Sequence, residues 1–335
     1  MQKKLSITNL AVTILGGIAL LITNTNSSGA AAGGDMNDDF GITKWKDGKK
    51  AVFMLEFDDS CVSHVKTAIP ELVKRSMVGT FYINPGNGPY QSQKEAWEKK
   101  IPKMEGIVYA NHTYKHKGAP SVEVLDEELA LCNEAINKCF PNMKQPRLIS
   151  FGQPGGVPWE ISNEEKNKLL AKYNLIDRPP FFGYPFHLKT REDVLKLVDT
   201  AIEKGEMRHI DFHGVGADWH VTPTDIYIDL LDKLEANRDI VWITDPVSYH
   251  QYLTERNASE LTVESKTANS VTFNLVCKTD SELYDLPLTI YAKIPAKWKS
   301  FTVTQNGAKV SSSISDGKLL FDVAPVNSKI VIKRQ

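Results

Sequence analysis

The sequence predicts an α/β fold of the β/α-barrel type, followed by a small all-β domain of sandwich type. From about Lys44 to Asn257, short apolar runs alternate with amphipathic helical patterns, which is typical of a parallel sheet covered by helices. From about Glu260, short β-rich runs follow without helices. The 335 residues suffice for one large domain and an accessory module.

The apolar runs of the first part are expected to form the sheet, because their nearly continuous apolar character suits strands buried on both faces. Two helices between them have start signals: Thr190 and Thr222 each precede an Asp three positions later, and Pro223 suits a first helical position. The predicted strands are 51–57, 79–83, 107–110, 148–151, 209–212 and 240–243, and the predicted helices are 65–75, 122–139, 164–173, 192–204 and 223–236.

The second part is expected to contain only strands. Turn-forming pairs, Asn306-Gly307 and Asp316-Gly317, separate some of its runs. A small module of this kind is predicted to be a sandwich. Its predicted strands are 261–265, 271–277, 286–294, 301–304, 319–323 and 329–333.

The N-terminus is predicted to be a secretory signal peptide. Lys3 and Lys4 precede an apolar run from about Leu10 to Ile22, and small residues up to Ala32 follow. A retained anchor is the alternative, although the run is short for a membrane span. The expected plan is a signal peptide at 1–30, a flexible leader at 31–44, a catalytic domain at 45–258 and a β-domain at 259–335, in a secreted or periplasmic protein without stable membrane insertion after cleavage.

Composition excludes some classes of protein. The formal net charge of −1 gives no reason to expect nucleic acid as a partner, whereas a neutral polysaccharide fits it, as do most small molecules. Four cysteines do not make a disulfide framework in a chain of this length. Cys132 and Cys139 lie about 10 Å apart along one predicted helix, beyond disulfide reach, and are expected in the core.

Side chains that can carry chemistry follow two of the predicted strands. Asp58 and Asp59 end the first strand, where barrels keep their active sites; a solvated loop or helix cap is the ordinary alternative. His112 and His116 follow another strand and, four residues apart, would project to one side if the segment is helical. With Asp59 they offer a metal one carboxylate and two imidazoles, leaving positions for water and substrate, as catalytic sites do.

His213 ends a third strand and precedes a glycine-rich loop, so it is expected on the same face of the barrel. Imidazole can act as a general acid near neutral pH. A lone His is more often structural, so its role depends on its neighbours.

These segments resemble the NodB-homology polysaccharide deacetylases, a family of carbohydrate esterases. The resemblance covers about Lys49 to Arg256. It implies a distorted (β/α) barrel that hydrolyses acetyl groups from sugars. The matching segments are Glu56-Phe-Asp-Asp59, Gly79-Thr-Phe-Tyr-Ile83, Asn111-His-Thr-Tyr-Lys-His116, Phe212-His213 and Val241-Trp-Ile-Thr244.

The resemblance also implies roles for individual residues. Asp58 would be the general base and His213 the general acid, while the backbone N–H of Gly155 would hold the oxyanion. The implied partner is an acetylated carbohydrate. One divalent metal ion, with zinc expected, would be bound by Asp59, His112 and His116.

Two positions depart from the family pattern. The third family motif usually carries an Arg that contacts the base, where this sequence has Gly152. Arg178 is the candidate replacement, because Arg147 lies at the other end of its strand. The family usually has Leu two residues before the acid His, where this sequence has Asp211. On a strand, Asp211 and His213 would face the same side, so Asp211 is expected to orient or charge His213.

Other side chains are weaker candidates for the site. Trp159, Trp219 and Tyr184 can stack on a sugar, and core packing is the alternative. Cys61 and His64 lie near the Asp pair and can be arranged as a nucleophile and base, but nothing else in the sequence supports a cysteine enzyme.

The sequence therefore predicts a metal-dependent hydrolase that removes acetyl groups from a poly- or oligosaccharide. Hydrolysis of a non-sugar amide on the same scaffold is an alternative suggested by the two departures. A sugar-binding protein that has lost catalysis is another. The presence of all five polar residues of the implied site argues against it.

Overall fold

The computed structural model of the protein describes residues 39–180, 188 and 190–335. The predicted signal peptide, the predicted leader up to residue 38, and Tyr184 lie outside the described residues. Among the helices of the described part, none has both the length and the apolar character that crossing a membrane requires.

The α/β part of the chain is built on a seven-stranded sheet around β2 (Ala51–Asp58), in which every residue is buried. Its strands run in the order β6-β5-β4-β3-β2-β7, β8 also pairs with β2, and all the pairings are parallel. The sheet curls into an open half-barrel, which confirms the predicted fold class. The other strands are β3 (Gly79–Ile83), β4 (Ile107–Asn111), β5 (Ile149–Phe151), β6 (Leu175–Asp177), β7 (Met207–Phe212) and β8 (Val241–Thr244).

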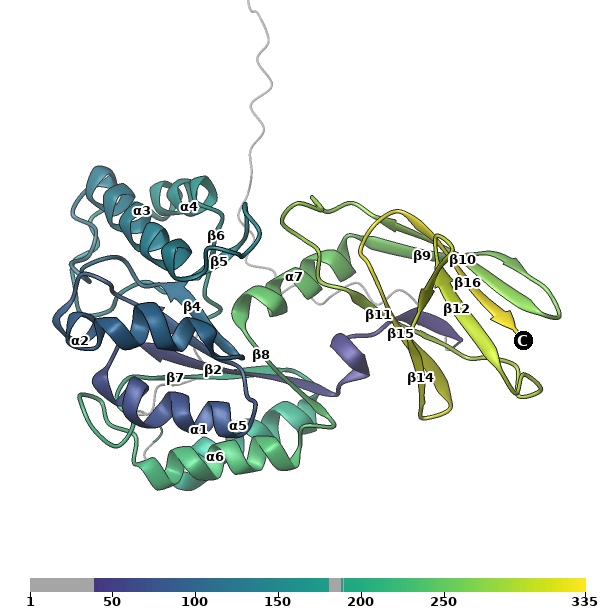
Figure 1. Ribbon diagram of the computed structural model, residues 1–335, viewed down its shortest axis with the longest axis horizontal. Coiled ribbons are helices and arrows are strands. Elements are labelled where there is room, and N and C mark those ends of the chain that lie inside the picture. Colours follow the sequence, from purple (N-terminus) through teal and green to yellow (C-terminus); the bar gives the residue numbers. More distant parts are fainter. Residues whose placement is uncertain (1–38, 181–187, 189) are drawn as a thin grey trace, which may run out of the picture. The chain divides into compact units, whose positions relative to one another are not determined.

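Helices cover this sheet, as Figure 1 shows. Helix α3 packs against β4, α4 against β6, and α5 against both β2 and β7. A π-helical turn, η2 (His64–Ala68), leads into the first helix, and η3 (Ala96–Lys100) and η4 (Ile101–Lys103) precede β4. The helices are α1 (Ile69–Lys74), α2 (Gly88–Ser92), α3 (Val122–Cys139), α4 (Asn163–Lys172), α5 (Arg191–Lys204), α6 (Thr224–Ala236) and α7 (Pro246–Asn257).

The predicted helix starts have mixed outcomes. Thr190 caps α5 in a reciprocal capping box with Asp193, as expected. The prediction that Thr222 caps α6 is wrong: Pro223 takes the cap position, and no side chain caps the helix. Thr222 is instead buried, and its backbone N–H donates to the Gly214 carbonyl, so a loop contact displaces the cap.

The C-terminal part consists of two antiparallel sheets with a shared core. Their orders are β1-β11-β15-β14 and β13-β12-β16-β10-β9, and buried side chains of both meet in one cluster. This agrees with the predicted sandwich-like module. The strands are β9 (Ser259–Lys266), β10 (Ser270–Cys277), β11 (Leu288–Ala292), β12 (Phe301–Gln305), β13 (Ala308–Val310), β14 (Ser312–Ser315), β15 (Lys318–Val323) and β16 (Ser328–Arg334).

Strand β1 (Phe40–Ile42) corrects the extent of the predicted flexible leader. It pairs antiparallel with β11, so residues 40–42 belong to a sheet of the β-module. Three residues are too short for a period-2 pattern to be recognised, and their partner lies some 250 positions away in the sequence. Long-range pairing therefore orders this segment.

Candidate metal centre and active site

The first half of the site is a tight turn at the carboxyl end of β2. After Asp58 the backbone enters the left-handed region at Asp59 (φ 72°) and Ser60 (φ 52°). Such φ values are strained for residues with a Cβ and persist only where the surroundings hold them. Here the Asn84 N–H donates to Ser60 Oγ (2.9 Å), and Asn87 Nδ2 donates to the Asp59 carbonyl (3.3 Å). The turn thereby presents both carboxylates to one cavity.

The second half is the loop that follows β4. The segment is not helical, so the condition for a shared helical face is not met: His112 and His116 lie on a loop with left-handed backbone at Thr113 (φ 61°) and His116 (φ 56°). Two hydrogen bonds hold it: Thr113 N–H to Asn111 Oδ1 (2.9 Å) and His116 N–H to Thr113 Oγ1 (3.1 Å). The two imidazoles nevertheless converge, with ring centroids 5.1 Å apart.

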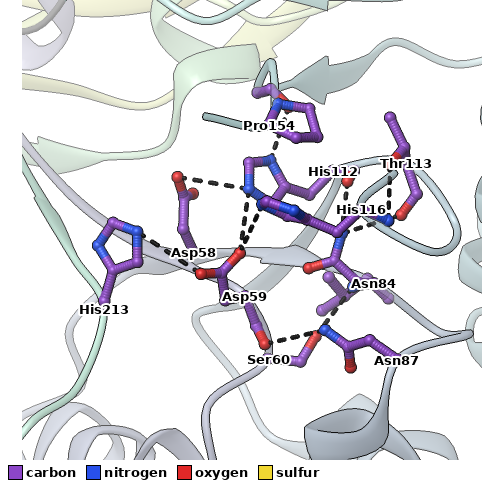
Figure 2. Close-up of polar contacts among 12 residues, drawn as sticks. Asp58, Asp59, Ser60, Asn84, Asn87, His112, Thr113, His116, Pro154 and His213 are labelled. Atoms are coloured by element: carbon purple, nitrogen blue, oxygen red, sulfur yellow. Dashed lines mark hydrogen bonds and ion pairs between the residues drawn. The ribbon is translucent and has the colours of Figure 1, made fainter. Parts of the chain in front are cut away.

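Asp59, His112 and His116 form a cluster of metal-ligand type. Their ligand atoms lie within 4.8 Å of one another, with Asp59 Oδ1 at 3.4 Å from His112 Nε2 and 3.1 Å from His116 Nε2. Figure 2 shows both imidazoles pointing toward Asp59. His112 Nδ1 lies 2.7 Å from the Gly152 carbonyl and donates to it, which leaves Nε2 free to bind a metal.

The chemistry of this cluster fits a divalent metal ion. Asp59 Oδ1 is buried and makes no hydrogen bond of good geometry with the described residues. Burial opposes the charge of Asp59, but the close approach of the His112 and His116 imidazoles outweighs it and holds the pKa of Asp59 well below the usual range. An ionised carboxylate beside two imidazole nitrogens is a ligand set suited to zinc and similar ions.

Asp58 is held by Arg178. Arg178 Nη1 and Nη2 donate to the two carboxylate oxygens of Asp58, at 2.8 and 3.0 Å, in a bidentate pair. Burial favours the neutral acid, but the guanidinium outweighs it and lowers the pKa of Asp58 to about 2. Arg178 thus makes the contact that the family assigns to the position of Gly152. It follows directly on β6, which the sequence pattern did not reveal.

The expected pairing of Asp211 with His213 is wrong. Asp211 Oδ1 lies 3.2 Å from Arg178 Nη1, and within the described part of the chain no ion pair joins it to His213. Asp211 is buried opposite Glu56 in the β2–β7 register. Strand alternation predicts a shared face only within a strand, and β7 ends at Phe212, so the backbone turns before His213.

His213 faces the metal-ligand cluster from the opposite side (Figure 2). Its Nε2 lies 3.6 Å from Asp59 Oδ2, and its carbonyl accepts a hydrogen bond from His64 Nε2 at 2.6 Å. Burial lowers the pKa of His213, against the opposing pull of Asp58 and Asp59. The buried His64 therefore holds the backbone of His213 in place. It does not belong to the cluster of metal-ligand type.

A cavity of about 290 Å³ joins these groups. The indole of Trp219, 39% exposed, lies at this cavity and donates from Nε1 to Asp59 Oδ2 at 2.9 Å. Trp159, in contrast, donates to the Pro154 carbonyl (2.9 Å) and packs on the hydrophobic core. The lining residues are Asp58, Asp59, His112, His116, Gln153, Gly155, Gly156, His213, Trp219 and His220.

The cysteine-enzyme alternative has no support in the structure. Cys61 is buried, and burial together with Asp59 raises the pKa of its thiol well above the usual range, so the nucleophilic thiolate is disfavoured. All four cysteines are free. Cys132 is buried on α3, as expected of a small core residue, and Cys139 is half-buried.

Some site residues were not found from the sequence. Asn84 donates from Nδ2 to the carbonyls of His112 and Thr113, so it joins the two halves of the site. Asn84 directly follows β3 and Asn87 lies three residues further on; polar residues just after a predicted strand are the signal that could have identified them. His220, which lies in a loop with a left-handed backbone (φ 47°), carries no such signal.

Comparisons with known proteins agree with this site. Residues 46–174 match the sequence family described as polysaccharide deacetylase. A gellan lyase of a Bacillus species is 30% identical over 110 residues, which are 32% of this chain and 4% of that protein.

Two solved structures are similar at low identity. The peptidoglycan deacetylase PdaC from Bacillus subtilis is 17% identical, with a TM-score of 0.43, over 62% of this chain and 94% of that one. A family 4 carbohydrate esterase from Streptomyces lividans in complex with acetate is also 17% identical, with a TM-score of 0.38, over 58% of this chain and 92% of that one.

The segment that matches the family contains the paired Asp residues after β2 and the two His residues after β4. The family was predicted from these same residues, and the match confirms it. Residues 46–174 of this chain therefore match the polysaccharide deacetylase family.

Proposed function

We propose that this chain is a metal-dependent hydrolase that removes acetyl groups, N- or O-linked, from a poly- or oligosaccharide. One observation supports it most: a cluster of metal-ligand type, a second ionised carboxylate and a third imidazole line the same cavity of about 290 Å³. This combination is what hydrolysis of an acetyl group needs, since water must lose a proton and the leaving group must gain one.

A divalent ion, with zinc expected, would be held by Asp59, His112 and His116. When bound, it would polarise the acetyl carbonyl and lower the pKa of water. Asp59 is ionised, and His112 is fixed through Nδ1 by the Gly152 carbonyl, so the ligands need little rearrangement.

The remaining groups move protons and stabilise charge. The ionised Asp58 accepts a proton from the attacking water, whose oxygen bonds to the acetyl carbon. The C–N or C–O bond to the sugar then breaks, and His213 gives a proton to the leaving amine or alkoxide. Gly155 lines the cavity, and its backbone N–H is the proposed donor to the oxyanion.

The proposal is tested by acetate release from a panel of N- and O-acetylated oligosaccharides, with and without a chelator. The native protein should release acetate from at least one of them, and chelation should abolish the release. Asp58→Asn should be inactive yet retain its metal, since Asp58 is not a proposed ligand. Acetate released only from non-sugar acetamides would favour the amide alternative, and glycan binding without release would favour a non-catalytic protein.

The ligand set has its own test. Elemental analysis should find about one divalent ion per native chain and none in a His112→Ala/His116→Ala variant, because loss of two ligands leaves a single carboxylate. Equal metal content in both proteins would refute the assignment.

We also propose that the protein is exported, as a secreted or periplasmic protein. The support is the order of basic, apolar and small residues before Ala32. The intact mass of the exported protein should correspond to a start within about ten residues of Ala30. A mass that includes Met1 would exclude export with cleavage.

A further inference from the structure

A groove of about 720 Å³ lies at the amino ends of β5 and β6, whereas the catalytic cavity lies at the carboxyl ends of the strands. It is formed by these strand ends and by the last turns of α3 and α4, two helices that pack side by side (Figure 1). The two hollows are therefore separated by the length of β5. The residues that line the groove are Ala130, Asn133, Glu134, Asn137, Lys138, Pro141, Gln145, Pro146, Arg147, Ile149, Lys172, Tyr173 and Asn174.

The cations of this groove differ in how they are paired. Lys138 Nζ lies 2.6 Å from Glu134 Oε1, and Lys172 Nζ lies 2.7 Å from Asp126 Oδ1. For Arg147, in contrast, no carboxylate in the described part of the chain lies within ion-pair distance. The groove thus contains one guanidinium whose charge is not compensated by a neighbouring side chain.

The Arg147 guanidinium is partly withdrawn from solvent. Its Nη2 donates to Asn137 Oδ1 at 3.1 Å, and its Cζ lies 6.0 Å from the centre of the Phe140 ring. Its Nε is buried and has no hydrogen-bond partner among the described residues. Burial lowers the pKa of Arg147. Because a desolvated cation without an anion is costly, a negatively charged ligand in the groove would offset that cost.

Asn137 holds this guanidinium without neutralising it. Its Oδ1 accepts both the bond from Arg147 and a bond from Gln145 Nε2, also at 3.1 Å. An aspartate in this place would accept the same two bonds and supply the missing negative charge. With the neutral amide, the guanidinium is fixed in position and keeps further N–H groups for a ligand.

The rest of the lining suits a sugar ring. Amide side chains such as those of Gln145 and Asn174 can bond hydroxyl groups, and Pro146 and Tyr173 offer apolar surface to the C–H face of a ring. A neutral sugar has no use for an uncompensated guanidinium. A uronic acid unit carries a planar carboxylate, which the fork of an arginine can bind with two parallel hydrogen bonds.

We propose that this groove is a second glycan-binding site, separate from the catalytic cavity, in which Arg147 binds the carboxylate of a uronic acid unit. The negative charge of the ligand is inferred from the groove alone, whereas the choice of a glycan over another anion rests on the proposed function.

The test is calorimetric titration of the full chain with a uronic acid oligomer that carries no acetyl groups. Arg147→Gln and Asn137→Asp should each weaken its binding at least about tenfold, because the first removes the charge-assisted hydrogen bonds and the second pairs the guanidinium internally. Arg238→Gln is the matched control and should bind within about twofold of the native protein. Arg238 donates only to the backbone carbonyls of Arg75 and Ser76 among the described residues, so its loss removes the same charge elsewhere.

Two further ligands test the chemistry of the site. A neutral oligosaccharide of the same length should bind at least about tenfold more weakly than the uronic acid oligomer, and so should inorganic phosphate. Phosphate that binds as tightly as the oligomer would show an adventitious anion site only and would overturn the proposal. So would a native protein that does not bind the oligomer, or equal binding by the native protein, Arg147→Gln and Asn137→Asp. Melting temperatures verify folding, and if Arg147→Gln does not fold, Asn137→Asp decides, since it keeps the acceptor for both donors.

A last comparison separates this site from the proposed function. The His112→Ala/His116→Ala variant should bind the uronic acid oligomer like the native protein, since both residues lie at the other end of the sheet. Loss of binding in that variant would place the ligand at the metal centre and overturn the proposal. A native protein that binds the oligomer through Arg147 but releases no acetate from any substrate would refute the function and leave the second site standing.

Discussion

Asp59 is constrained from three sides by groups that are far apart in the sequence. His112 and His116 approach Oδ1, whereas Trp219 donates to Oδ2 at 2.9 Å and His213 Nε2 lies 3.6 Å from the same oxygen. Occupying Oδ2 leaves Oδ1 as the oxygen that faces the two imidazoles. Loss of a group that orients a ligand in this way typically lowers metal affinity by about 10- to 100-fold.

Replacement of Trp219 by phenylalanine separates its hydrogen bond to Asp59 from the aromatic face that it offers to a substrate. Trp219→Phe keeps an aromatic face at the cavity but removes the N–H that bonds Asp59 Oδ2. We expect metal affinity to fall about tenfold, because the carboxylate is freer to rotate, while KM for substrate changes less than about twofold. Metal affinity is measured by competition with a chelating dye. Trp159→Phe, which loses a bond to the Pro154 carbonyl instead, is the control and should bind metal like the native protein. Unchanged affinity in Trp219→Phe would show that the hydrogen bond does not orient the ligand.

At the scale of elements, the loop between β4 and α3 decides whether the two His residues converge. It is tied to the loop that follows β5, where the Ala119 N–H donates to the Pro158 carbonyl at 3.0 Å. Gly118 has φ 81°, and a Cβ there would lie 2.1 Å from that same carbonyl oxygen. Gly118 is thus required both by its backbone conformation and by the close approach of Pro158.

Gly118→Ala should therefore destabilise the protein and disturb the metal centre. The left-handed backbone costs about 1–2 kcal/mol for an L-residue, and displacement of Pro158 adds to it. Gly307→Ala is the matched control: Gly307 also has positive φ (86°), but nothing lies within 4 Å of its added Cβ. Chemical denaturation should show a larger loss for Gly118→Ala than for Gly307→Ala, and only Gly118→Ala should weaken metal binding. Equal losses would mean that the Pro158 contact relaxes without cost.

At the scale of the whole molecule, buried polar groups also occur away from the site. Glu255 on α7 is buried; its Oε1 accepts the Leu286 N–H at 2.9 Å, and its Oε2 has no hydrogen-bond partner among the described residues. Burial raises the pKa of Glu255 to about 8. The carboxyl is therefore protonated in the folded protein under conditions where the unfolded chain would ionise it.

This difference predicts a pH dependence of stability. Between pH 4.5, the usual value for Glu, and about 8, the folded state retains a proton that the unfolded state has released, so the free energy of unfolding falls as pH rises through this window. Glu255→Gln cannot ionise, so the variant should lack this part of the decline. Its free energy of unfolding should fall less between pH 5 and pH 8 than that of the native protein. Denaturant melts at several pH values measure it, with the exposed Glu260→Gln as control. A decline of the same steepness in Glu255→Gln would contradict the assignment to this group.

Local sequence patterns predict the layers of the molecule and the ligands of its proposed metal site. Helix α3 was predicted with its observed bounds, because one apolar face repeats through Leu125, Leu129 and Cys132. Asp59, His112 and His116 were identified because each follows a strand, and the ends of parallel strands meet at one edge. Both patterns are local, so no long-range information was needed.

The pairing of the buried charged side chains, in contrast, could not be predicted from local patterns. Strand β6, β1 and the loop turns are short, and their conformation depends on partners distant in the sequence, so they carry little local signal. Strand alternation favoured Asp211 beside His213. The end of β7 and the buried guanidinium of Arg178 placed Asp211 with Arg178 instead. A buried carboxylate pairs with whichever cation the fold brings within reach, and that choice depends on the spatial arrangement of strands and not on sequence spacing.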